Sequence, residues 1–236
     1  MRMVYRLFTV GLKQIRRDGM LLFLLPAPFL IGMVFRFLLP WADQILRREF
    51  SLTLEPWYQL SDAFLIVATP SIVAAISGLL ILEELDEGLN LYYTVTPAGG
   101  RKYLTARLLI PMLWAFPCSV LVLVLFSLTA ISWWQLLITA FLGTVFGGTL
   151  GIMVVSFAQN KVEGLAYTKL TGAFSVGLPV VWLFRPPYQY LAAWLPSFWI
   201  GKILVELKPT TVFIGILVTF GWAIIFWKRF LTKTIV

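Results

Sequence analysis

The sequence predicts an all-α integral membrane protein, and three observations support this fold class. The chain of 236 residues is 60% hydrophobic and 13% charged, and its mean hydropathy is +0.88. Soluble domains are typically about 45–50% apolar and about 25% charged. Separate apolar stretches each approach the roughly 20 residues that a helix needs to cross hydrocarbon. Ten tryptophans and eight tyrosines are typical of a chain that meets two lipid headgroup layers.

Residues 2–17 predict an amphipathic helix that lies in the membrane interface, within an interfacial segment 1–18. Apolar residues recur at helical spacing on one face, and basic residues share the other: Arg2, Arg6, Lys13 and Arg17. A cleaved signal peptide is the alternative. It fits poorly, because the apolar run after Asp18 is too long and has no small-residue cleavage site.

Six apolar stretches predict six membrane spans. The expected spans are residues 20–40, 62–82, 105–128, 134–157, 168–185 and 210–228. The fifth is short and contains Pro179. Residues 186–207 are rich in proline and aromatic side chains, and we interpret them as an interfacial or re-entrant segment before the last span. The length of the chain predicts one membrane domain, residues 1–236.

The distribution of lysine and arginine predicts the orientation in the membrane. With the N-terminus inside, cytoplasmic segments hold thirteen of the basic residues and outer segments hold six. This bias favours cytoplasmic N- and C-termini and an even number of spans. The net charge of +8 is therefore attributed to topology and contact with anionic lipid. Nucleic-acid binding is disfavoured, because the basic residues are divided among short loops.

The longest polar stretch outside the spans is residues 83–107. It begins with an acidic strip, turns at Gly88 and ends in a basic strip that enters the third span. Thr96-Pro97 indicates a helix start, because threonine caps free amides and proline suits the first turn. The candidates for contact with a soluble partner are Glu83, Glu84, Asp86, Glu87, Gly88, Thr96, Pro97 and Arg101. A solvated loop whose charges hold the helix ends in place is the alternative.

This stretch resembles the cytoplasmic segment of type-2 membrane permease subunits of ATP-binding-cassette transporters. The family pattern is an acidic residue, then Glu-Gly-Thr-Leu-Glu or similar, then Thr/Ser-Pro and a basic run. The matching residues are Glu84, Glu87-Gly88-Leu89, Thr96-Pro97 and Arg101 through Arg107. Leu89 directly follows Gly88, where the family has threonine. The resemblance covers the whole chain in layout and is specific over residues 83–107.

The resemblance implies a subunit of a small bacterial exporter in the bacterial cell membrane. Its cargo would be a drug, an antimicrobial peptide or a lipid-like amphiphile. Residues 83–104 would contain the coupling helix that docks on a separate ATPase subunit, and residues 158–169 would form a second contact. No G-x-x-x-x-G-K-[ST] motif occurs in the chain. ATP and Mg are therefore expected in the ATPase subunit, with no cofactor, metal or catalytic residue in this chain.

Six spans are half the usual complement of this family, which implies a second permease copy or a homologue. Gly143, Gly147 and Gly151 form overlapping G-x-x-x-G pairs in the fourth span, and small residues at this spacing let helices approach closely. They favour packing within one subunit, and a dimer seam is the alternative. Substrate contacts are expected from the second and fifth spans and from residues 186–207.

Two charges lie near the outer ends of spans. Arg36 and Asp62 are expected at the same level, so an ion pair between them is one hypothesis. Snorkelling of Arg36 to the headgroup layer is the alternative.

Other function classes fit the sequence less well than the permease. An intramembrane enzyme is disfavoured, because the chain has no histidine to act as a base or a metal ligand. A secondary transporter or channel is the better rival, although no span carries a central carboxylate or lysine. A membrane scaffold would share this composition. The single cysteine, Cys118, forms no internal disulfide.

Overall fold

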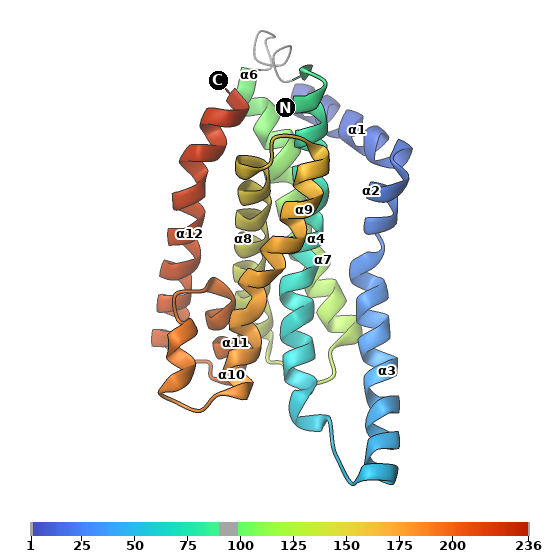
Figure 1. Cartoon of the computed structure of the whole chain (residues 1–236), viewed down its shortest axis with the longest axis vertical. Coiled ribbons are helices and arrows are strands. Elements are labelled where there is room, and N and C mark those ends of the chain that lie inside the picture. Colours follow the sequence, from blue (N-terminus) through green and yellow to red (C-terminus); the bar gives the residue numbers. More distant parts are fainter. Residues whose placement is uncertain (1, 90–98, 236) are drawn as a thin grey trace.

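The computed structural model describes residues 2–89 and 99–235, and within these ranges the chain is helical with no β-strand. Both termini lie at the same end of an elongated helical bundle, as an even number of passes requires (Figure 1). We call this the terminal end and the opposite one the far end. The predicted all-α membrane fold is confirmed.

The predicted interfacial helix is present as α1 (Arg2–Arg17), which crosses the terminal end obliquely (Figure 1). Its apolar face packs on the bundle, with Leu7 and Ile15 buried, while Arg16 and Arg17 are exposed. Asp18 then ends α1 and begins α2 (Gly19–Leu24). Its carboxylate accepts hydrogen bonds from the backbone N–H groups of Met20 and Leu21 at 2.9 and 3.1 Å, which satisfies amides that a helix start leaves free.

Among the described residues, five helices are long and apolar enough to span a membrane. They contain the predicted first, second, fourth and sixth spans, and they overlap the predicted third span, which extends two residues past Phe126. Their bounds are Gly19–Phe50 (α2 with α3, Ala27–Phe50), Glu55–Asp86 (η1, Glu55–Trp57, with α4, Tyr58–Asp86), Lys102–Phe126 (ending in α7, Ile110–Phe126), Trp133–Phe157 (α8) and Pro209–Thr234 (within α12, Pro209–Ile235).

The predicted fifth span is not one long helix. The chain runs from the terminal end to the far end through α9 (Lys161–Thr171), η3 (Gly172–Val176) and α10 (Gly177–Leu183) (Figure 1). The regular α-helix of this span is interrupted in η3, directly before the helix that contains Pro179. Pro179 lies in the first turn of α10, where a missing N–H group removes no helical hydrogen bond. The irregularity is the 3₁₀ stretch of η3.

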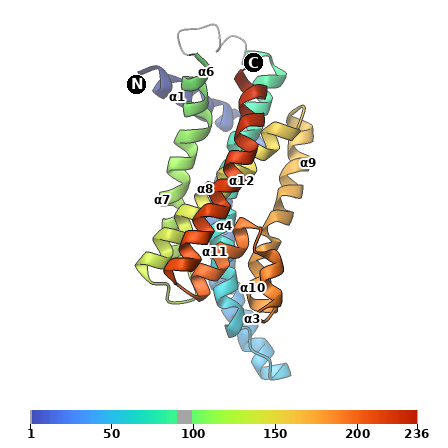
Figure 2. The same ribbon diagram turned by 90° about the vertical axis from the view of Figure 1, so that its left-hand side faces the viewer.

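The aromatic segment forms η4 (Tyr188–Ala192) and α11 (Pro196–Val205), and α11 is buried along nearly its whole length. It packs against α8, α10 and α12 (Figure 2). The carbonyl group of Leu204, near its C-terminal end, accepts hydrogen bonds from the side-chain amides of Gln59 and Gln135 at 2.7 and 3.2 Å. Protein groups thus satisfy the end of this short helix, as a re-entrant segment requires.

At the far end, Arg36 and Asp62 both hold the turn between α7 and α8. The Asp62 carboxylate accepts hydrogen bonds from the backbone N–H groups of Leu128 and Thr129, each at 2.9 Å. The guanidinium group of Arg36 donates to the carbonyl oxygen of Ser127 at 2.8 Å. The structure describes both side chains and gives no ion pair between them, so each binds the shared turn in place of the hypothesised direct pair.

Helices α4 and α8 form the centre of the bundle, and the glycine stripe of α8 makes their close contact possible. A Cβ atom on Gly147 would lie 2.7 Å from the carbonyl carbon of Pro70, and one on Gly151 would lie 3.0 Å from the carbonyl oxygen of Ala74. A Cβ atom on Gly143 would lie 2.7 Å from the carbonyl oxygen of Ile66. The stripe therefore packs on α4 of the same chain.

We predict that Gly147→Ala destabilises the protein, because the added methyl group meets backbone atoms that cannot rotate away. Overpacking of this kind costs about 1–3 kcal/mol. Thermal melting in detergent, followed by size-exclusion chromatography, measures the change. Gly221→Ala in α12 is the matched control, because a Cβ atom there meets no atom within 4 Å. Equal melting temperatures for the two variants would contradict the packing account.

Candidate functional site

The predicted coupling segment begins where α4 ends, at the terminal end. Asp86 and Glu87 are exposed at the C-terminus of α4, and Gly88 adopts a left-handed φ of 69° that L side chains rarely adopt. Thr96 and Pro97 lie outside the described residues, as does the side chain of Arg101. The chain re-enters the described structure in α6 (Gly99–Leu104), which continues through a π-helical turn, η2 (Thr105–Leu109), into α7.

Glu84 faces the interior of the bundle, where it forms a buried ion pair with Arg107 in η2. The guanidinium group donates hydrogen bonds to both carboxylate oxygens, with 2.8 Å from Nε to Oε2, and the hydroxyl group of Tyr103 donates to Oε2 at 2.9 Å. The side chains of Glu84 and Arg107 are 0% and 1% exposed. The predicted direct contact of Glu84 with a partner does not fit this placement, because the carboxylate has no exposed surface.

Arg107 also holds α1 on the bundle. Its Nη1 atom donates to the carbonyl oxygen of Leu7 at 2.6 Å, and Nη2 donates to the side-chain oxygen of Gln14 at 3.3 Å. Gly11 faces the guanidinium group, and a side chain there would collide with it. A single buried cation therefore connects α1, α4 and the start of α7. We name Glu84, Arg107 and Tyr103 the buried joint.

A second set of charges connects α9 to the same region. The ammonium group of Lys161 donates hydrogen bonds to the carboxylates of Asp18 and Glu83, the latter at 2.9 Å, and the backbone N–H of Lys161 donates to Asp86 at 2.8 Å. The hydrogen bond from Lys161 lowers the pKa of Asp18 below its ordinary value. The contact therefore persists above pH 3.8, the ordinary pKa of this group, and is lost only as the pH falls through the lowered value.

These contacts change the interpretation of the acidic strip. Glu83 and Asp86 bind Lys161 within the chain, Glu84 is buried, and Glu87 is exposed at the end of α4. Sequence reasoning missed Arg107 as the partner of Glu84 and placed it in a general basic run. The available signal was position, because Arg107 falls inside the predicted third span, where an unpaired charge is costly.

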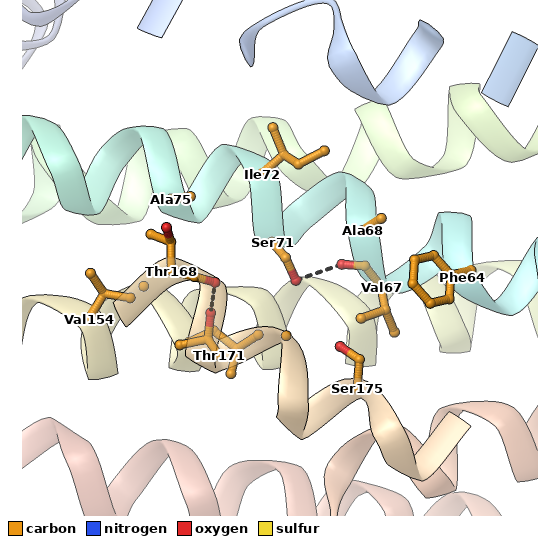
Figure 3. Close-up of a pocket in the computed structure, with 13 residues that line it drawn as sticks. Phe64, Val67, Ala68, Ser71, Ile72, Ala75, Val154, Thr168, Thr171 and Ser175 are labelled. Atoms are coloured by element: carbon orange, nitrogen blue, oxygen red, sulfur yellow. Dashed lines mark hydrogen bonds between the residues drawn. The ribbon is translucent and has the colours of Figure 1, made fainter. Parts of the chain in front are cut away.

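A pocket of about 310 Å³ opens on the side of the bundle between α4, α8 and the α9–η3 segment (Figure 3). Apolar side chains from α4 and α8 form most of its wall, including Phe64, Val67 and Val154. Residues of the predicted second and fifth spans line this pocket, and the expected substrate contacts from these spans stay a prediction. Residues 186–207 do not line this pocket.

Hydroxyl groups from α4 and the α9–η3 segment also line the pocket: Ser71, Thr168, Thr171 and Ser175. The hydroxyl of Ser71 donates to the carbonyl oxygen of Val67 at 2.7 Å, and that of Thr171 donates to the carbonyl oxygen of Thr168 at 2.8 Å (Figure 3). Because these protons point back to the helix, the hydroxyl oxygens can still accept a hydrogen bond. The pocket thus offers an apolar surface with a few acceptors.

The apolar helices, the interfacial α1 and the side pocket are features of a multi-pass membrane permease. The family model described as "Fluoroquinolones export permease protein Rv2686c-like" matches residues 11–231. The chain belongs to this family, which confirms the predicted resemblance to an ATP-binding-cassette permease and its role in membrane export.

Two curated relatives are named as fluoroquinolones export permease proteins. They are MT2760 of Mycobacterium tuberculosis strain CDC 1551 / Oshkosh and Rv2686c of strain ATCC 25618 / H37Rv. Each is 25% identical to this chain over 192 residues, which cover 79% of this chain and 75% of the relative. No solved structure matches the chain.

We predict that Glu84→Ala strongly destabilises the protein, because it leaves the charge of Arg107 buried without a counter-ion. Removal of one partner of a buried ion pair costs about 3–5 kcal/mol. Glu87→Gln, three residues along the same helix and exposed, is the control and should change stability by no more than about 0.5 kcal/mol. Thermal melting in detergent checks both variants. Similar melting of Glu84→Ala and the wild type would show that the buried joint contributes little.

Proposed function

We propose that this chain is the membrane subunit of an ATP-driven exporter of fluoroquinolones or similar planar drugs. It would work with a second permease copy or homologue and with a separate ATPase subunit that binds ATP and Mg. The buried joint is the observation that best supports this proposal. It holds α4, which precedes the coupling segment, against η2, which follows it. The printed names of the relatives support the substrate class.

The joint suggests how a partner would act on this chain. An ATPase subunit that binds at residues 87–101 would push or pull on the C-terminus of α4 and the start of α6. Glu84 and Arg107 lie on either side of this segment and bind each other, so α4 and α7 would move together, and α1 would follow through Leu7. Glu87, at the exposed end of α4, is the favoured direct contact.

The side pocket is the proposed substrate surface. Its volume lies at the lower end of the range of about 300–1,000 Å³ that is typical of small-molecule sites. The pocket is open on one side, and a second copy that covers this side would enclose it. The glycine stripe of α8 packs on α4 of the same chain, which favours the pocket side over the stripe as the seam between two copies.

We predict that Glu87→Lys releases the ATPase subunit, because it reverses the charge at the exposed end of α4. The tagged chain is purified from its native membrane in mild detergent, and mass spectrometry quantifies a co-purifying soluble subunit with a P-loop. Glu49→Lys makes the same charge change on an exposed residue of α3 and should retain the subunit. If the wild type purifies alone in several detergents, the rival classes of secondary transporter, channel or scaffold take precedence.

We predict that Gly172→Leu impairs drug export without unfolding the protein. Gly172 lines the pocket, and a Cβ atom there meets no atom within 4 Å, so the added side chain can occupy pocket space. The KM for export of a fluorescent fluoroquinolone from proteoliposomes should rise about tenfold, which corresponds to about 1.4 kcal/mol. Gly221→Leu, also in open space but outside the pocket, is the control. An unchanged KM in Gly172→Leu would place the substrate elsewhere.

A further inference from the structure

A second and larger cavity lies beneath α1, separate from the side pocket. Its volume is about 450 Å³, and it is open to one side of the bundle. The apolar face of α1 forms its roof through Phe8, Gly11, Leu12 and Ile15. Helices α2 to α4 and α7 supply the walls. The cavity extends along α7 from Pro111 to Cys118, which is a depth of about 10 Å at 1.5 Å per residue.

The lining of this cavity presents almost no free polar group. Ser77 donates its hydroxyl proton to the carbonyl oxygen of Val73 at 3.1 Å, and Arg107 is engaged by Glu84, Leu7 and Gln14. The remaining polar groups of the lining are the thiol of Cys118 and the indole N–H of Trp114, and the other lining residues, such as Pro28 and Ile76, are apolar. A drug with several polar groups would lose hydrogen bonds to water here without replacement, whereas an alkyl chain would lose none.

The basic residues of α1 next to the cavity indicate which lipid headgroup would bind there. An interfacial helix lies at the boundary between headgroups and acyl chains, so a cavity under its apolar face is at the depth where acyl chains begin. The exposed side of α1 carries Arg6, Lys13, Arg16 and Arg17, and the helix contains no acidic residue. Each basic residue near the surface attracts anionic lipid by about 1 kcal/mol.

We propose that this cavity binds one acyl chain of an anionic phospholipid from the leaflet that contacts α1. The headgroup lies against the basic face of α1, and the chain lies under Leu12 and Ile15 along α7. The bound lipid fills the space between α1 and α7 next to the buried joint. The site is independent of the exporter proposal, because neither the drug nor the ATPase takes part in it.

Native mass spectrometry of the purified full-length protein tests the proposal. Wild-type protein should retain one phospholipid per chain when phosphatidylglycerol is added and much less with phosphatidylcholine. Cys118→Trp fills the cavity and should lose this adduct. Leu121→Trp, on the same helix but exposed outside the cavity, should keep it. An adduct that survives Cys118→Trp, or equal retention of both lipids, would overturn the proposal.

The chain's single cysteine provides a second measurement without any engineered residue. In delipidated wild-type protein, phosphatidylglycerol should slow the reaction of Cys118 with N-ethylmaleimide roughly tenfold, because thiol reactivity follows access. Combined Arg16→Gln and Arg17→Gln substitutions should weaken this protection. A fluoroquinolone at saturating concentration should give none. Protection by the drug, or no protection by phosphatidylglycerol, would contradict the lipid assignment.

Discussion

The organisation of the terminal end depends on one buried ion pair, between Glu84 and Arg107. Two charges removed from water are costly unless their geometry is good and further hydrogen bonds satisfy the remaining atoms. Here the guanidinium group contacts both carboxylate oxygens and also binds α1, and Tyr103 adds a hydrogen bond to the carboxylate. The pair therefore fixes how α1, α4 and α7 meet at the point where the coupling segment leaves and re-enters the bundle.

Helix α4 connects the three regions that matter for the proposed function. Its C-terminal end carries Glu84 and the exposed Glu87, its middle lines the side pocket through Ser71, and its other end holds the α7–α8 turn through Asp62. Close packing of α8 on α4 makes these two helices one body. The α9–η3 segment forms the opposite wall of the pocket and is bound to α4 through Lys161 and Glu83. Relative movement of these walls would change the shape of the pocket.

Much of the fold could be predicted from the sequence, because long apolar helices carry a strong compositional signal. The amphipathic α1 and the five long spans followed from the spacing and length of apolar runs. The fifth crossing and α11 were harder to predict, since distant residues stabilise them. Ser197 donates a hydrogen bond to Phe174 in η3, and Gln59 donates one to the end of α11. The acidic strip does not show which of its four neighbouring carboxylates faces Arg107, because the rotation of α4 about its own axis decides this. The inward orientation of Glu84 was therefore not predictable from the strip.

Coupled drug transport in proteoliposomes tests the central claim, that the buried joint transmits movement from the coupling segment to the pocket. Wild-type protein and Glu84→Gln are reconstituted with the ATPase subunit, and ATP hydrolysis and uptake of a fluorescent fluoroquinolone are measured together. Size-exclusion chromatography first establishes that the variant is folded. The account predicts that Glu84→Gln still binds the ATPase and hydrolyses ATP but transports less drug per ATP. An unchanged ratio of drug to ATP would contradict it.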